Sequence, residues 1–96
     1  MSLLAWNVHG LNGNGKQREV VDLIQKLQVP LVALLETSTK KGMEVDFLMK
    51  LPSYEYFSNF DGHPSGRILI IWKKSEVHLK VLHATEQVIH CEVITS

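Results

Sequence analysis

The chain has 96 residues, of which 45% are hydrophobic and 21% charged, a composition typical of one small globular domain rather than a disordered segment. Ten basic and ten acidic side chains give a formal net charge of zero, which excludes an overall field that would attract nucleic acid or an anionic membrane. The single cysteine, Cys91, can form no internal disulfide, and no apolar run reaches the roughly 20 residues of a membrane span. We therefore expect a soluble intracellular protein, in the nucleus or the cytoplasm, that contacts no membrane.

The first part of the sequence predicts a strand, a helix and a second strand. Residues 3–8 are a short apolar run that ends in a loop rich in glycine and asparagine, which is typical of a strand and a turn. Residues 16–27 have the period of an amphipathic helix. One face of this helix carries Val20, Ile24 and Leu27. Residues 31–36 are almost continuously apolar, as in a strand covered on both faces. This order favours a parallel βαβ unit whose two strands end at the same edge of a sheet.

The second part of the sequence predicts mainly strands. Residues 43–51 favour a short helix that Pro52 ends, and residues 54–57 begin another strand. Residues 60–66, FDGHPSG, are rich in turn formers. Three short β-prone runs follow, at residues 66–74, 77–82 and 87–94. Because polar turns separate them, their simplest arrangement is an antiparallel meander.

One candidate site is the loop between the first strand and the helix. Gly10, four residues, Gly15 and Lys16 have the spacing of a phosphate-binding loop, in which main-chain N–H groups and a lysine surround phosphates. Gln17 takes the position where such a loop has a serine or threonine that binds Mg²⁺. A nucleotide-binding loop is therefore one hypothesis for this chain, with plain turn residues as the alternative.

A second candidate site lies at the ends of the two parallel strands. Asn7 is near the end of the first strand and Glu36 is at the end of the second, so an amide and a carboxylate would share one rim. A carboxylate that follows apolar neighbours needs a partner or a cation, and oxygen ligands suit Mg²⁺. The alternative is that Glu36 emerges into solvent while residues 37–39 cap the next segment.

Several segments carry a resemblance to a known family. These are SLLAWNVHGLN at residues 2–12, PLVALLETSTK at 30–40, SNFDGHPSGRILIIWKK at 58–74 and VIHCEV at 88–93. Together they resemble the start of the endonuclease/exonuclease/phosphatase superfamily, and most of all the apurinic-endonuclease-like domain of plant LINE-type (non-LTR) retrotransposons. The resemblance runs in order along almost the whole chain but covers less than half of that family's domain. It identifies residues 1–96 as the N-terminal portion of such a domain.

The resemblance implies an α+β fold, the N-terminal part of a four-layer DNase I-like sandwich with a mixed sheet and helices on its outer face. Family members hydrolyse phosphate esters, DNA among them, with Mg²⁺, for which Mn²⁺ can substitute. It assigns catalytic roles to Asn7, which organises the active site, and to Glu36, which binds the metal. It assigns no substrate-binding residue. His9 stands where repair members usually have Asp and plant retroelement members tend to have Arg.

The resemblance also implies that parts of the active site lie beyond residue 96. The family's later motifs are a Tyr, an Asp-Asn pair and a closing Asp-His pair that holds the general base. We therefore expect a truncated endonuclease-like domain that is inactive alone. Without a second sheet, the inner faces of residues 3–8, 31–36 and 67–72 would be exposed, which predicts self-association or binding to a complementing fragment. A non-catalytic interaction module is the alternative function.

Overall fold

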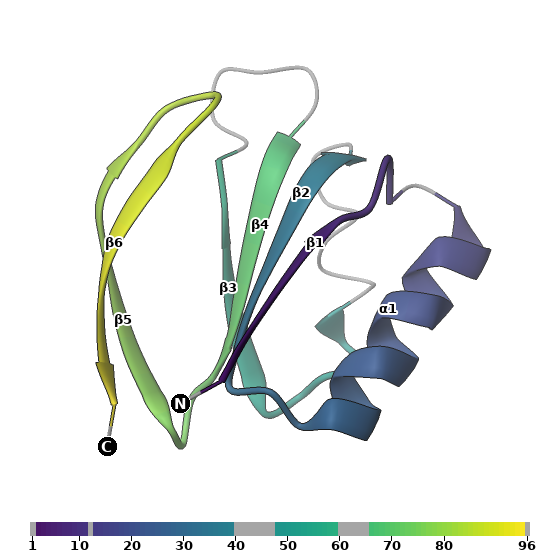
Figure 1. Cartoon of the computed structure of the whole chain (residues 1–96), viewed down its shortest axis with the longest axis horizontal. Helices are drawn as coiled ribbons and strands as arrows, with labels where there is room; N and C mark the ends of the chain where they lie inside the picture. The colour runs from purple at the N-terminus through teal and green to yellow at the C-terminus, as the bar shows by residue number, and fades with distance from the viewer. Residues whose placement is uncertain (1, 12, 40–47, 60–65, 96) are drawn as a thin grey trace.

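The computed structural model describes residues 2–11, 13–39, 48–59 and 66–95, which form six strands and one long helix (Figure 1). Their bounds are β1 Leu3–Asn7, α1 Asn14–Leu27, β2 Leu31–Thr39, β3 Tyr54–Ser58, β4 Gly66–Lys73, β5 Val77–Ala84 and β6 Ile89–Thr95. Four strands make one sheet and the last two make another. Helix α1 covers one face of the larger sheet and the β5–β6 hairpin covers the other, so the described residues form three layers (Figure 1).

The larger sheet is mixed, with the strand order β1-β2-β4-β3. Strand β1 pairs with β2 in parallel, and β4 pairs antiparallel with both β2 and β3. The parallel βαβ unit predicted from the sequence is confirmed, since Leu3 lies opposite Leu31 and Asn7 opposite Leu35. The carboxyl ends of β1 and β2 therefore share one rim of the sheet.

Helix α1 packs on the sheet through the face that the sequence indicated, with one exception. Val20, Val21 and Ile24 are buried against the sheet. Leu27, which was expected on the same face, is 50% exposed. The reason is that the helix ends there, where Gln28 takes a left-handed conformation (φ 53°) and its N–H bonds to the carbonyl of Ile24 at 2.9 Å.

Strand β4 is apolar on both faces, and this decides its place in the fold. Leu69 and Ile71 are buried with the helix, whereas Ile70 and Trp72 are buried with the hairpin. A strand with apolar side chains on both faces buries most of them when it lies inside a sheet that is covered on both sides. The predicted meander of three strands is therefore wrong, because β4 pairs with β2 and β3 while only β5 and β6 pair with each other.

The β5–β6 hairpin covers part of the inner face of the sheet, which was expected to be exposed. Leu31, Ile70 and Trp72 keep less than a tenth of their surface exposed, because residues of β5 and β6 pack over them. The expected large exposed inner face is therefore wrong for β4 and for the start of β2. Leu3, 59% exposed, and Leu35, 38% exposed, are the large apolar side chains of β1 and β2 that lie outside the hairpin's cover.

Asn59 joins the hairpin to the sheet. Its side chain is 6% exposed, and its Oδ1 accepts hydrogen bonds from the main-chain N–H groups of Arg67 (3.1 Å) and Ile68 (2.8 Å). Its Nδ2 donates to the carbonyls of Thr85 and Glu86, both at 2.9 Å. All four hydrogen-bonding positions of the amide are used, so one buried side chain holds the start of β4 against the turn between β5 and β6.

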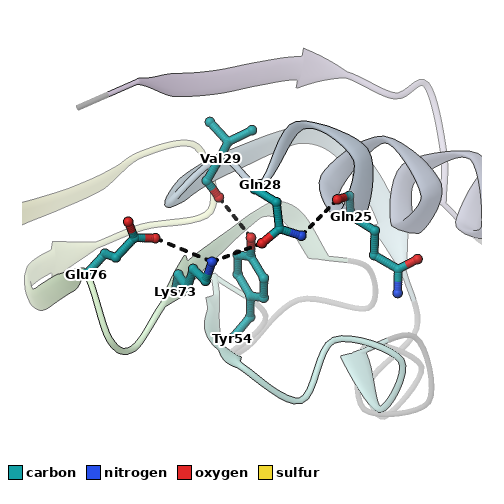
Figure 2. A network of polar contacts seen from close by, with 6 residues as sticks. All are labelled: Gln25, Gln28, Val29, Tyr54, Lys73 and Glu76. Carbon is teal, nitrogen blue, oxygen red and sulfur yellow. Dashed lines mark hydrogen bonds and ion pairs between the residues drawn. The ribbon is translucent and has the colours of Figure 1, made fainter.

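A polar network closes the opposite end of the sheet (Figure 2). The hydroxyl of Tyr54 donates to the carbonyl of Val29 at 3.0 Å. The ammonium of Lys73 bonds to Oε1 of Gln28 at 2.9 Å and lies 3.6 Å from the carboxylate of Glu76. Burial raises the pKa of Tyr54 above 10.0, and the charge of Glu76 raises it further. The network connects the end of the helix to both β3 and β4.

Two sequence predictions fall largely outside the described residues. The short helix expected at residues 43–51 is described only from residue 48, where a single helical position precedes a turn. The turn expected at residues 60–66 lies outside the described part except for its last position, where β4 begins. Among the described residues, no helix has the length and the apolar character needed to cross a membrane.

Replacing Asn59 with alanine should lower the free energy of unfolding by about 2 to 3 kcal/mol, because buried donors and acceptors on both sides lose their partner. Urea unfolding followed by circular dichroism measures this change. The control is Gln87→Ala, which alters an exposed side chain on the same turn and should cost less than about 0.5 kcal/mol. Equal losses in the two variants would contradict the role given to the Asn59 amide.

Tyr54→Phe should lower the free energy of unfolding at neutral pH by about 1 kcal/mol, through loss of the bond to Val29. Because folding raises the pKa of Tyr54 above its unfolded value of 10.0, its contribution is complete below pH 10 and is lost as the pH rises through the folded pKa. The difference between wild type and variant should therefore shrink above pH 10 in urea titrations. Tyr56→Phe, at a residue 38% exposed, is the control. A difference that stays constant with pH would refute this account.

Candidate active site

Asn7, His9 and Glu36 meet at the rim where β1 and β2 end. The main-chain N–H of His9 donates to Oδ1 of Asn7 at 3.2 Å. The ring Nδ1 of His9 lies 3.3 Å from Oε2 of Glu36. The rim predicted from the sequence therefore exists, and His9 bridges the amide and the carboxylate. This connection could not be read from the sequence, because it depends on how the chain turns after β1.

The main chain continues to pair with β2 after β1 has ended. The N–H of Val8 donates to the carbonyl of Leu35 at 3.0 Å, that of Gly10 to Glu36 at 2.7 Å and that of Leu11 to Thr37 at 2.7 Å. The side chains of Val8 and Leu11 are buried, each with 1% of its surface exposed. These contacts hold the main chain of residues 35–37 in place. The carboxylate of Glu36 therefore projects from a fixed main chain.

The main chain of the rim has an unusual conformation. His9, Glu36 and Ser38 have φ values of 51°, 54° and 49°, and Gly10 has a φ of 98°. The pairing between β2 and β4 shifts register between Leu35 and Thr39, which marks a bulge. Residues other than glycine rarely take positive φ, and such residues store of order 1–3 kcal/mol of strain each and gather at functional sites.

The bulge decides where Glu36 points. Thr37 is fully buried, whereas the side chain of Glu36 is 61% exposed. The left-handed conformation interrupts the alternation of faces and turns the carboxylate outward, where its Oε2 has the ring of His9 as a partner at 3.3 Å. The emergence of Glu36 into solvent, which was part of the alternative, is observed and leaves the carboxylate accessible to a cation. The capping by residues 37–39 is not observed, since these residues belong to β2.

The donor atoms of the rim fit a hydrated Mg²⁺ ion. Glu36 offers carboxylate oxygens, the hard ligands that Mg²⁺ and Mn²⁺ accept, and Mg²⁺ is commonly held by one or two carboxylates with water completing its shell. Oδ1 of Asn7 already accepts the main-chain N–H of His9. The described residues hold no group of three or more His, Cys, Asp and Glu side chains placed to bind a metal. Among the described residues the rim thus offers a cation one carboxylate, and a tighter site needs further ligands.

The residues of the phosphate-loop hypothesis make other contacts. Lys16 lies 3.6 Å from the carboxylate of Glu19, and its ammonium is 5.3 Å from the centre of the Trp6 ring. The Nε2 of Gln17 donates to the carbonyl of Leu11 at 2.7 Å. These bonds connect the loop to the first turn of α1, and none of them prepares Gln17 as a metal ligand. The rim formed by Asn7 and Glu36 is therefore the better supported candidate site.

Comparison with known proteins identifies the fold. No protein-family model and no curated protein matches the chain. Solved structures do match, and they include proteins of the endonuclease/exonuclease/phosphatase family. The chain has the α+β, DNase I-like fold of these proteins, with a mixed sheet and a helix on its outer face, and it forms a fragment of that fold.

Three structures illustrate the match. D. rerio TDP2 in complex with a single-stranded DNA product has 22% identity and a TM-score of 0.70, over 98% of this chain and 40% of that one. An endonuclease/exonuclease/phosphatase family protein from Bacteroides thetaiotaomicron has 15% identity and a TM-score of 0.58, over 84% of this chain and 33% of that one. A mannosyl-6-phosphatase from the same organism has 16% identity and a TM-score of 0.57, with the same coverage. The chain therefore spans well under half the length of each of them.

Glu36→Gly should raise the free energy of unfolding by about 1 kcal/mol relative to Glu36→Gln, because glycine adopts positive φ without strain. Both variants remove the carboxylate, so the pair isolates the conformational term from the charge. Urea unfolding of the two proteins side by side is the measurement. Equal midpoints would mean that position 36 stores no strain in the folded chain.

Proposed function

We propose that this chain forms the metal-binding corner of a Mg²⁺-dependent phosphodiesterase of the endonuclease type. In this proposal Glu36 binds the metal, and Asn7 orients the substrate phosphate. The observation that carries the proposal is the rim itself, where parallel strands place Asn7 and Glu36 together and a strained bulge presents the carboxylate to solvent. Strain at an exposed carboxylate is typical of a functional site and costs stability elsewhere.

The residues of the rim have distinct tasks in this function. A bound Mg²⁺ ion would supply positive charge to a developing phosphorane and polarise a phosphoryl oxygen. The carboxylate of Glu36 would hold that ion. With Oδ1 of Asn7 fixed by the main chain of His9 at 3.2 Å, the NH₂ group of the same amide is oriented to donate a hydrogen bond to a phosphate oxygen. Nδ1 of His9 lies 3.3 Å from Oε2 of the Glu36 carboxylate, so His9 contacts both Asn7 and Glu36.

DNA is the substrate that we propose. The fold alone does not choose a substrate, and the matching structures include TDP2 with a single-stranded DNA product and a mannosyl-6-phosphatase. The sequence resemblance to the endonuclease-like domain of LINE-type retrotransposons favours DNA, and with it an origin from such an element. The nuclear or cytoplasmic site of action expected from the cysteine content is part of the same proposal.

We also propose that these 96 residues do not hydrolyse DNA alone. The described residues provide one carboxylate at the rim and no cluster of three metal-ligating side chains. The family motifs that hold the general base have no counterpart in this sequence, and loss of a general base typically costs about two to four orders of magnitude in rate. Activity therefore requires residues supplied by a further segment or a complementing fragment.

Millimolar Mg²⁺ should shift the amide ¹H–¹⁵N signals of the chain at the end of β1 and along the bulge of β2, and nowhere else. Glu36→Gln should abolish these shifts, because it removes the only carboxylate of the rim among the described residues. Plasmid DNA incubated with the wild-type chain and Mg²⁺ should be nicked no faster than with the variant.

Three results would contradict these proposals. Mg²⁺ shifts that persist in Glu36→Gln would place the metal elsewhere. An absence of shifts in wild type up to tens of millimolar Mg²⁺ would remove the metal corner. Nicking by wild type that the substitution abolishes would keep the metal site and overturn the inactivity of the chain.

A further inference from the structure

A recess of about 260 Å³ lies beside Glu36, between the rim of the larger sheet and the tip of the hairpin. It is lined by Leu35, Glu36, Arg67, Ile68 and Gln87. Leu35 and Glu36 come from the end of β2, Arg67 and Ile68 from the start of β4, and Gln87 from the turn between β5 and β6 (Figure 1). The recess is therefore a joint product of both sheets.

The main chain of the two walls of the recess is held by part-buried and exposed hydrogen bonds. The amide of Asn59 binds the main chain of Arg67 and Ile68 on one wall and the carbonyls of Thr85 and Glu86 on the other. The hydroxyl of Thr85 accepts hydrogen bonds from the main chain of Gln87 at 3.2 Å and of Val88 at 3.1 Å. The main chain around the recess is consequently held in place, which limits the ordering that binding requires to the exposed side chains of the lining.

The chemistry of the lining is divided by position. Leu35 and Ile68 are apolar, and they lie opposite each other in the pairing of β2 with β4. Arg67 is exposed and carries a permanent positive charge, and Gln87 is an exposed amide on the facing turn. Arginine matches the geometry of a phosphate with two parallel hydrogen bonds. An apolar floor suits the face of a sugar or a base.

We propose that this recess binds one nucleotide of a DNA strand, next to the phosphate that Asn7 orients at the rim. Arg67 holds the nucleotide's phosphate, Leu35 and Ile68 pack against its sugar and base, and Gln87 donates a hydrogen bond from the hairpin. The volume is close to the lower end of ordinary ligand sites, about 300 Å³, so the recess takes one nucleotide rather than several. This inference rests on the proposed function for its substrate class and extends it by a binding subsite.

The test measures binding of a fluorescein-labelled single-stranded DNA octamer to the full chain by fluorescence anisotropy, in EDTA and at low salt. Arg67→Ala should weaken binding about tenfold and lower the salt dependence of log K by about one unit, as loss of one phosphate contact does. Arg67→Lys, which keeps the charge and loses the double hydrogen bond, should fall between the alanine variant and wild type.

Lys74→Ala is the matched control, since it removes one exposed positive charge at the opposite end of β4. It should change the affinity less than twofold. The main-chain bond from Arg67 to Asn59 survives both substitutions at position 67, and dispersed amide spectra of these variants verify folding. Equal losses in Arg67→Ala and Lys74→Ala, or no binding by wild type, would overturn the subsite.

The design separates this inference from the proposed function. Because EDTA removes divalent ions, the octamer experiment does not depend on metal binding by Glu36. Mg²⁺ shifts at the rim together with equal losses at positions 67 and 74 would keep the metal corner and remove the subsite. A selective effect of Arg67 without Mg²⁺ shifts would keep a DNA-binding recess and remove the metal corner.

Discussion

The parallel pairing of β1 with β2 is the interaction on which the candidate site depends. It continues beyond the end of β1, through main-chain bonds from Val8, Gly10 and Leu11 to the carbonyls of three successive residues of β2. These bonds fix the bulge at residues 36–38 while β2 loses its register with β4. If β2 paired only with β4, no hydrogen bonds would stabilise the positive φ of Glu36 and Ser38. The exposed carboxylate of Glu36 thus follows from continued pairing on the β1 side of β2 and a shifted register on the β4 side.

The second constraint is the two-sided apolar character of β4. Because its alternate residues need cover on opposite faces, the helix and the hairpin must lie on opposite sides of the sheet. That arrangement brings the turn between β5 and β6 to the same end of the molecule as the rim formed by Asn7 and Glu36 (Figure 1). The polar network of Tyr54 and Lys73 occupies the other end (Figure 2). The polar network therefore stabilises one end of the sheet, and the candidate site lies at the other end.

The structural matches support the fold of this chain but not its substrate. They establish the fold, over 84% to 98% of this chain and 33% to 40% of the matching chains. They do not select a substrate, since proteins with this fold act on different phosphate esters. Evidence for the substrate must therefore come from the residues of this chain. An amide and an arginine beside the recess suit an anionic ligand better than a small apolar one, and the carboxylate of Glu36 joins them once a cation neutralises it.

The sequence by itself determined the order of elements, the parallel βαβ unit and the meeting of Asn7 with Glu36. It could do so because apolar periodicity and the direction of parallel strands are properties of short segments. The tertiary structure alone decided the layer of the hairpin, the outward turn of Glu36, the bridge through His9 and the recess with Arg67 and Gln87. These features rest on contacts between distant positions, such as the bonds of Asn59 to residues 26 and 27 positions away. No local pattern encodes such contacts. Glu and Ser rarely adopt positive φ, so the sequence does not predict it at residues 36 and 38. Asn59 precedes a segment rich in turn formers, where an Asn is expected for its turn propensity and not for buried hydrogen bonds.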